Sequence, residues 1–160
     1  MKMKQSLYER ALAEARKASP DLGKVFSMLQ KADQGGDPRA AYALGTWWLH
    51  GHYVKKDVRK GLQLIRAAAS ANVSDALFDL AVSFELGNGM PKNDEKAALS
   101  YLQAALNGDE QAFFEVGRCY YYGIGFRKDR GLARVWLEKA KRLGTFDAAK
   151  GRPRKSVSLR

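Results

Sequence analysis

The sequence predicts an all-α protein built from repeated helix-loop-helix units, and three observations support this prediction. Residues of the same kind recur every 36 positions without a gap, from about residue 20 to residue 148. Within each period, small and apolar residues lie four apart, the spacing that places side chains on one helix face. No run alternates between apolar and polar residues as a half-buried strand would. Stacked helix pairs would bury one continuous core, because a single pair cannot cover its own apolar face.

The first helix of each period is marked by small, apolar and aromatic columns and ends at a glycine. The columns are Ala40, Ala76, Ala112 and Ala148; Leu44, Leu80 and Val116; Trp48, Phe84 and Tyr120; and Gly51, Gly87 and Gly123. Since residues four apart share a face, we expect the aromatic column to be buried. Each glycine follows the last periodic residue, where a helix C-cap needs a positive φ.

A second helix follows in each period. Asp57, Asn93 and Asp129 stand where its N-cap belongs, because their side chains can accept a hydrogen bond from a backbone N–H. In the last period this helix runs over about residues 130–143. The predicted ends are Asn72, Gly108 and Gly144, and asparagine is the non-glycine residue that tolerates a left-handed cap.

These units resemble the Sel1-like repeat family, a relative of the tetratricopeptide repeat. The best copy reads AFFEVGRCYYYGIGFRKDRGLARVWLEKAKRLGTFDA over residues 112–148, whereas the copy from Ala40 has Tyr53 in place of the second loop glycine. The resemblance implies a right-handed α/α superhelix, or solenoid, and a non-enzymatic adaptor. It implies the following division: 1–39, a capping helix and partial repeat; 40–75, 76–111 and 112–147, Sel1-like repeats; 148–160, a basic tail.

The loop Gly87-Asn88-Gly89 invites another interpretation, a phosphate-binding turn. In nucleotide-binding folds such a turn follows a strand, and no strand is predicted here. The loop also recurs in three periods, which favours architecture over an active site. We therefore expect no bound nucleotide and no other cofactor.

Two further features could carry chemistry. His50 and His52 form an H-x-H pair, but metal sites need three or four ligands and no others are signposted. Cys119 is the single cysteine, so it forms no intrachain disulfide, and as a nucleophile it would need a base nearby. We expect loop histidines and a packing cysteine, hence neither a metal site nor an enzyme.

In related solenoids the first helices line a concave surface, and we expect a protein or peptide partner to bind there. Trp47 and Tyr122 are large, and nothing in the repeat pattern requires an aromatic side chain at either place. Exposed aromatics are common anchors of a peptide groove. The predicted partner-binding residues are Trp47, His50, Asp79, Glu115, Arg118 and Tyr122.

The charge distribution leaves open an alternative, binding of nucleic acid or another polyanion. The net charge is +11, but residues 76–111 carry six acidic and two basic side chains. A nucleic-acid binder would prefer one continuous basic stripe. Residues 148–160 have five basic side chains and no acid, so the polyanion candidates are Lys150, Arg152, Arg154 and Lys155. The lone cysteine and the lack of a long apolar run predict a cytoplasmic protein without a membrane span.

Overall fold

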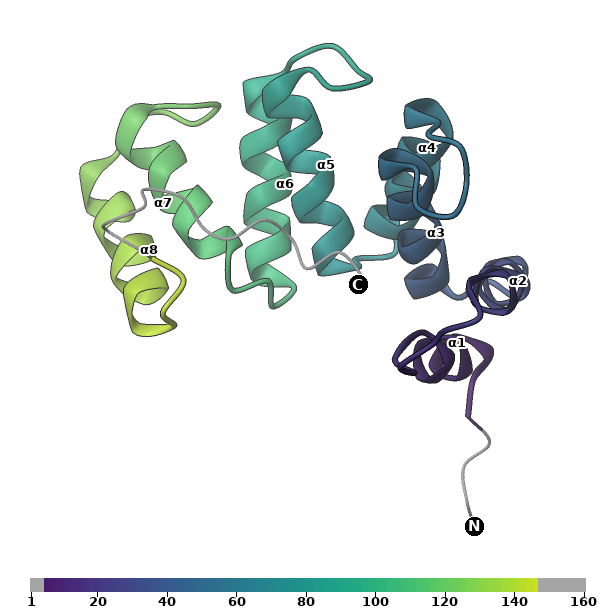
Figure 1. Ribbon diagram of the computed structural model, residues 1–160. Helices are drawn as coiled ribbons and strands as arrows, with labels where there is room; N and C mark the ends of the chain where they lie inside the picture. Colours follow the sequence, from purple (N-terminus) through teal and green to yellow (C-terminus); the bar gives the residue numbers. More distant parts are fainter. Residues whose placement is uncertain (1–4, 147–160) are drawn as a thin grey trace. The chain divides into compact units, whose positions relative to one another are not determined.

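The computed structural model describes residues 5–146, which form eight α-helices and contain no strand (Figure 1). The all-α prediction is confirmed. The chain divides into two compact units, an N-terminal unit over residues 5–71 and a C-terminal unit over residues 72–146 of the described range. The N-terminal unit holds α1 (Leu7–Ala15), α2 (Leu22–Gln34), α3 (Pro38–His50) and α4 (Val58–Ser70). The C-terminal unit holds α5 (Ser74–Leu86), α6 (Asp94–Leu106), α7 (Ala112–Tyr122) and α8 (Arg130–Arg142).

Asx side chains start the second helix of each repeat, as predicted. Asp57, Asn93 and Asp129 each accept a hydrogen bond from the backbone N–H three residues further on, over 2.8–3.0 Å. Asp21 does the same at the start of α2, with a 3.0 Å bond from the Lys24 N–H. These bonds satisfy backbone donors that have no partner within the helix.

The predicted helix ends are also confirmed. Gly51, Gly87 and Gly123 cap α3, α5 and α7 in the left-handed conformation, with φ of 77°, 68° and 76°. The residues that follow the second helices are left-handed too, namely Asn72, Gly108 and Gly144. Within the C-terminal unit α5 pairs antiparallel with α6, and α7 with α8, as α3 does with α4 in the N-terminal unit (Figure 1).

Tyr53 takes the place of a glycine without changing the loop. It aligns with Gly89 and Gly125 in the other repeats and shares their left-handed conformation, with φ of 60°. For a residue with a side chain this conformation costs about 1–2 kcal/mol. The Tyr53 ring packs against Phe26, at 5.5 Å between centroids, and against Trp47, at 5.9 Å. Aromatic packing therefore offsets the backbone cost.

Small residues let the two helices of each repeat approach closely. A Cβ on Gly61 of α4 would lie 2.8 Å from the Gly45 carbonyl oxygen and 2.7 Å from the Leu49 amide nitrogen of α3. The two backbones are therefore in contact at this point. The matching residues in the C-terminal unit are Ala81 with Ala97 and Gly117 with Ala133, all buried.

The core of the N-terminal unit includes Trp47, contrary to the prediction that its side chain is exposed. Trp47 is only 5% exposed and stacks on Phe26 of α2, with ring centroids 5.9 Å apart. Its neighbours in this core include Val25, Leu29 and Leu44. Trp47 is buried because α2 packs against α3 and covers the face that the repeat pattern leaves open.

The aromatic column expected to be buried is half-buried instead. Trp48, Phe84 and Tyr120 all keep part of their rings in water. The Lys60 ammonium lies 3.7 Å from the centre of the Trp48 ring, and Tyr120 stacks on Phe126 at 4.7 Å. Long cationic side chains, loop residues and, at Trp48, the Phe26 ring of α2 cover these rings only in part. Six residues before Phe84 and Tyr120, Phe78 and Phe114 are buried, whereas the aligned Tyr42 is half-buried.

Replacing Gly125 by alanine should destabilise the protein far more than replacing Gly108. Both glycines are left-handed, which costs an alanine about 1–2 kcal/mol. A Cβ at Gly108 meets nothing within 4 Å, whereas one at Gly125 would collide with the Asp94 carbonyl of α6. Gly125→Ala should therefore cost about 3 kcal/mol or more. Urea unfolding followed by circular dichroism measures both, and equal losses would contradict the packing of this loop on α6.

Trp47→Ala should cost about 3–5 kcal/mol of stability, as expected for a large buried aromatic. Trp48→Ala should cost clearly less, because part of that ring is already in water. Thermal and urea unfolding of the two variants give the ranking. A larger loss for Trp48→Ala would refute the assignment of Trp47 to the core.

Acidification should remove a specific contribution to the stability of α3. Asp37 caps this helix and accepts hydrogen bonds from the Arg39 side chain, at 3.0 Å from Nε and 2.7 Å from Nη2. These hydrogen bonds lower the pKa of Asp37, against the opposing effect of burial. Because the folded pKa is below the unfolded value of about 3.9, the contribution is present above that value and is lost as pH falls through the folded pKa. Asp37→Asn keeps the capping oxygen without titrating, so its unfolding free energy should fall less between about pH 5 and pH 2. Parallel pH dependences for the two proteins would exclude Asp37 as the source.

Candidate functional site

An arginine shared by two glutamates ties the first helices of the C-terminal unit together. Arg118 of α7 donates from Nε to Glu115 Oε2 over 2.6 Å and from Nη2 to Glu85 Oε1 of α5 over 2.7 Å. The Tyr101 hydroxyl of α6 donates to the other Glu85 oxygen over 2.8 Å. These four residues, called here the Arg118 network, connect three helices. Their bonds fix α7 relative to α5 and α6.

The Arg118 network lies mostly out of water. The side chains of Glu115, Arg118 and Glu85 are 10%, 22% and 23% exposed. Burial by itself lowers the pKa of Arg118, but the charges and hydrogen bonds of Glu115 and Glu85 outweigh it, so this pKa lies above its usual range. Burial, reinforced by the same carboxylates, raises the pKa of Tyr101. The guanidinium therefore stays charged and the phenol stays protonated, as their hydrogen bonds require.

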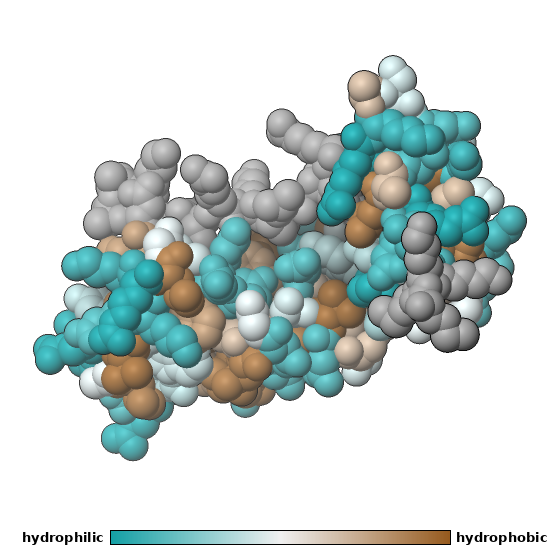
Figure 2. All heavy atoms as spheres, turned by 90° about the horizontal axis from the view of Figure 1, so that it is seen from below, coloured by the Kyte–Doolittle hydropathy of each residue, from teal (hydrophilic) through white to brown (hydrophobic). Residues whose placement is uncertain are grey.

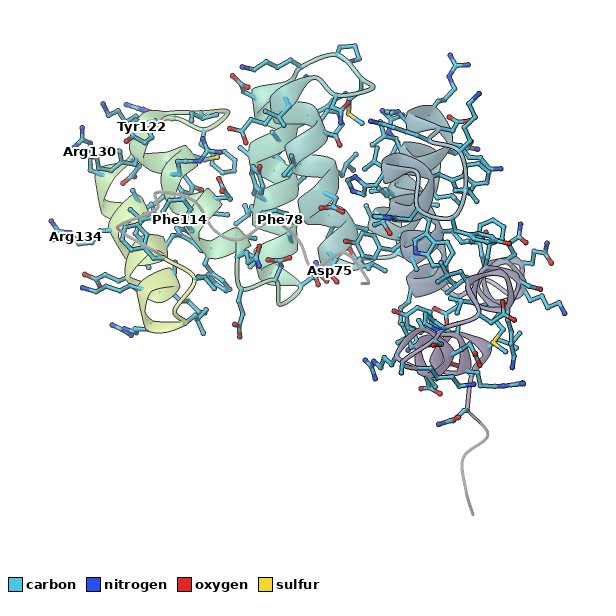
Figure 3. All side chains as sticks on the ribbon, in the orientation of Figure 1. Asp75, Phe78, Phe114, Tyr122, Arg130 and Arg134 are labelled. Atoms are coloured by element: carbon cyan, nitrogen blue, oxygen red, sulfur yellow. The ribbon has the colours of Figure 1, made fainter. Side chains whose placement is uncertain are left out.

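Two large apolar side chains lie in water beside this network. Leu86 and Tyr122 are 71% and 67% exposed, and they are the last residues of α5 and α7. They occupy the same position in consecutive repeats. Leu86 follows Glu85 directly, and Tyr122 lies one helical turn beyond Arg118, so the ion pair holds the two helix ends close together. Figure 3 labels Tyr122 near the end of α7.

The remaining predicted groove residues divide into exposed and buried groups. His50, aligned with Leu86 and Tyr122, is exposed, and Asp79 is half-buried. Glu115 and Arg118 are engaged with each other. Other residues on these first helices are buried, namely Ala43, Thr46, Ser83 and Cys119. Only the final residue of each first helix is therefore well exposed among the positions predicted to face a partner.

Cys119 of α7 is buried, with 1% of its surface exposed. Burial raises the pKa of the Cys119 thiol to about 12, so it keeps its proton at neutral pH. The His50 and His52 rings lie 6.0 Å apart. Within residues 5–146 no cluster of three or more His, Cys, Asp or Glu side chains is arranged to hold a metal ion.

Sequence reasoning missed Glu85 and Tyr101 and did not single out Leu86 as a binding residue. Glu85 and Arg118 are 33 residues apart, one helical turn short of the repeat, so matching positions across repeats does not pair them. The opposite charges of Glu85 and Arg118 at that separation were the signal in the sequence that could have identified this ion pair. The polyanion candidates Lys150, Arg152, Arg154 and Lys155 lie outside the described residues. In the described range no helix has the length and apolar character needed to cross a membrane.

Comparison with known proteins supports the repeat assignment. The Sel1 repeat model matches residues 38–73, 74–109 and 111–145, well over half of the chain. The chain is 29% identical over 167 residues to DAP3-binding cell death enhancer 1 of Mus musculus, covering 80% of this chain and 32% of the mouse protein. It is 29% identical over 162 residues to Activator of C kinase protein 1 of Saccharomyces cerevisiae, covering 89% of this chain and 26% of the yeast protein. The chain thus spans about a third or less of these relatives.

A solved structure shows the same fold. The crystal structure of a Sel1 repeat protein from Oxalobacter formigenes superposes with a TM-score of 0.78 at 27% identity, covering 86% of this chain and 57% of that one. Each segment matched by the family model holds one helix pair, namely α3 with α4, α5 with α6, and α7 with α8. Repeats of this family are scaffolds for protein–protein interaction. This chain belongs to the Sel1 repeat family.

Proposed function

We propose that this chain is a non-enzymatic adaptor that binds a segment of a partner protein across the ends of α5 and α7. The observation that carries this proposal is the exposure of Leu86 and Tyr122 on helix ends held together by the Arg118 network. A large apolar side chain in water gains free energy when a partner covers it. Tyrosine is enriched among the residues that dominate binding energy.

The rigidity of the site supports this function. An interface that is already ordered loses less conformational entropy on binding. Arg118, Glu115 and Glu85 hold one another with bonds of 2.6–2.7 Å, so they need no partner to fix their positions. In this proposal the network is the support of the site, while Leu86 and Tyr122 make the contact.

The family and a relative's name point to the same class of function. Sel1 repeats are interaction scaffolds, and the mouse relative is by its name a protein that binds another protein. The protonated, buried Cys119 thiol supports a non-catalytic role, because the thiolate is the nucleophile. A cytoplasmic location is part of the proposal, and fractionation of the native cell would test it.

Removing the two exposed side chains should weaken partner binding without unfolding the protein. Each residue can contribute about 2 kcal/mol to an interface. Leu86→Ser or Tyr122→Ser should therefore lower the affinity for a captured partner about thirtyfold. Thermal unfolding should change little, because both side chains lie largely in water. Affinity capture from native lysate identifies candidate partners, and titration of each purified partner gives the dissociation constant.

The matched control is the pair Leu99→Ser and Val135→Ser. These residues also occupy equivalent repeat positions and are 45% and 63% exposed, but they lie on the second helices α6 and α8. If a partner no longer binds the control variants but still binds Leu86→Ser and Tyr122→Ser, the binding surface lies elsewhere. Nucleic-acid binding that falls steeply with salt and disappears on deleting residues 151–160 would instead favour the polyanion alternative.

A further inference from the structure

The end of the C-terminal unit that carries α8 holds an open hollow of about 390 Å³. It is lined by Tyr121, Arg130, Arg134, Leu137, Glu138, Lys141 and Phe146. The lining of the hollow therefore includes both apolar and cationic side chains. Figure 2 shows apolar and polar side chains intermixed at this end of the molecule.

The preceding repeat shows what this face holds when it is filled. On α6 the matching face receives the following repeat: the loop at Gly125 packs so closely that a Cβ there would meet Ala98 and the Asp94 carbonyl. Ala98 and Ala105 of α6 are 0% and 4% exposed. The occupant of that face is thus a polypeptide segment, lying directly on the helix.

Two substitutions change this face in α8. The positions of Ala98 and Ala105 become Arg134 and Lys141, one repeat later. Both are exposed, and neither side chain forms an ion pair or hydrogen bond with another described residue. A third cation is Arg130, whose guanidinium lies 4.2 Å from the centre of the Tyr121 ring. Figure 3 shows Arg130 and Arg134 on α8, at the edge of the unit away from α6.

We propose that this end face binds an acidic peptide segment, with an apolar side chain of the peptide in the hollow and its carboxylates on Arg134 and Lys141. Three cations against the single Glu138 give the charge complementarity for such a segment. The apolar floor formed by Leu137, Phe146 and Tyr121 suits a side chain better than a sugar-phosphate backbone. The hollow adjoins the proposed site at Tyr122, because the Tyr121 and Tyr122 rings lie 4.8 Å apart, but its cations Arg134 and Lys141 lie on α8 rather than on α5 or α7.

The chain's own tail is a poor match for this face. Residues 147–160 carry five basic side chains and one aspartate, so they would place like charges beside Arg134 and Lys141. Like-charge contacts at an interface are unfavourable. The complementary ligand is therefore a separate acidic segment.

The test is fluorescence anisotropy with the full chain and a short labelled peptide in which glutamates flank a central leucine. Wild-type protein should bind it, and Arg134→Ala/Lys141→Ala should weaken binding about tenfold or more, equivalent to about 1.4 kcal/mol. The control Lys55→Ala/Arg59→Ala removes the same charge from exposed positions in the N-terminal unit and should leave the affinity within about twofold. The same peptide with glutamines should bind much more weakly.

Four results would overturn the proposal. If Lys55→Ala/Arg59→Ala lost as much affinity for the peptide as Arg134→Ala/Lys141→Ala, binding would depend on net charge alone. Equal binding of the glutamine peptide would remove the role of the carboxylates. A single-stranded oligonucleotide that binds through Arg134 and Lys141 while the peptide does not would make this a polyanion site. Sedimentation of the wild type as a dimer and of Arg134→Ala/Lys141→Ala as a monomer would make a second copy the occupant.

Discussion

The close approach of two helices at small residues is the constraint on which each repeat depends. A Cβ on Gly61 would collide with the α3 backbone at Leu49 and Gly45, and a Cβ on Gly45 would collide with the Ile65 side chain of α4. Once the two helices are this close, their larger side chains must point to other faces. Ile65 and Leu62 fill the space beside this contact and are almost completely buried. The small pair therefore sets which side of each helix becomes core and which becomes surface.

The sequence predicted the helices and their boundaries because caps are local. An aspartate or asparagine at an N-cap and a left-handed residue after a helix need only their own neighbours in the chain. Asp57, Asn93 and Asp129 recur at one spacing, so a single interpretation explained three helix starts. Predicting burial requires knowing what packs from outside the repeat. Trp47 was misplaced because Phe26 of α2, outside the matched repeats, covers it.

The candidate site was predictable only in part for a related reason. The repeat register correctly placed Tyr122 on the surface. It could not reveal that Arg118 bridges two carboxylates, because that bond joins residues 33 apart and uses rotamers that no column of aligned positions specifies. Half-buried charges depend on the geometry of several helices at once. Tertiary structure, rather than residue type, distinguishes a contact residue from its support.

The left-handed Tyr53 couples a loop to a helix that is distant from it in sequence. Its conformation persists because its ring is packed against Phe26 and Trp47. If α2 detaches from α3, Tyr53 loses that packing while keeping its strained backbone, and the loop between α3 and α4 then has reason to relax as well. Docking of α2 and order of this loop thus form one cooperative opening unit. Amide hydrogens in the two segments would accordingly exchange with similar opening free energies, even though a whole helix separates them along the chain.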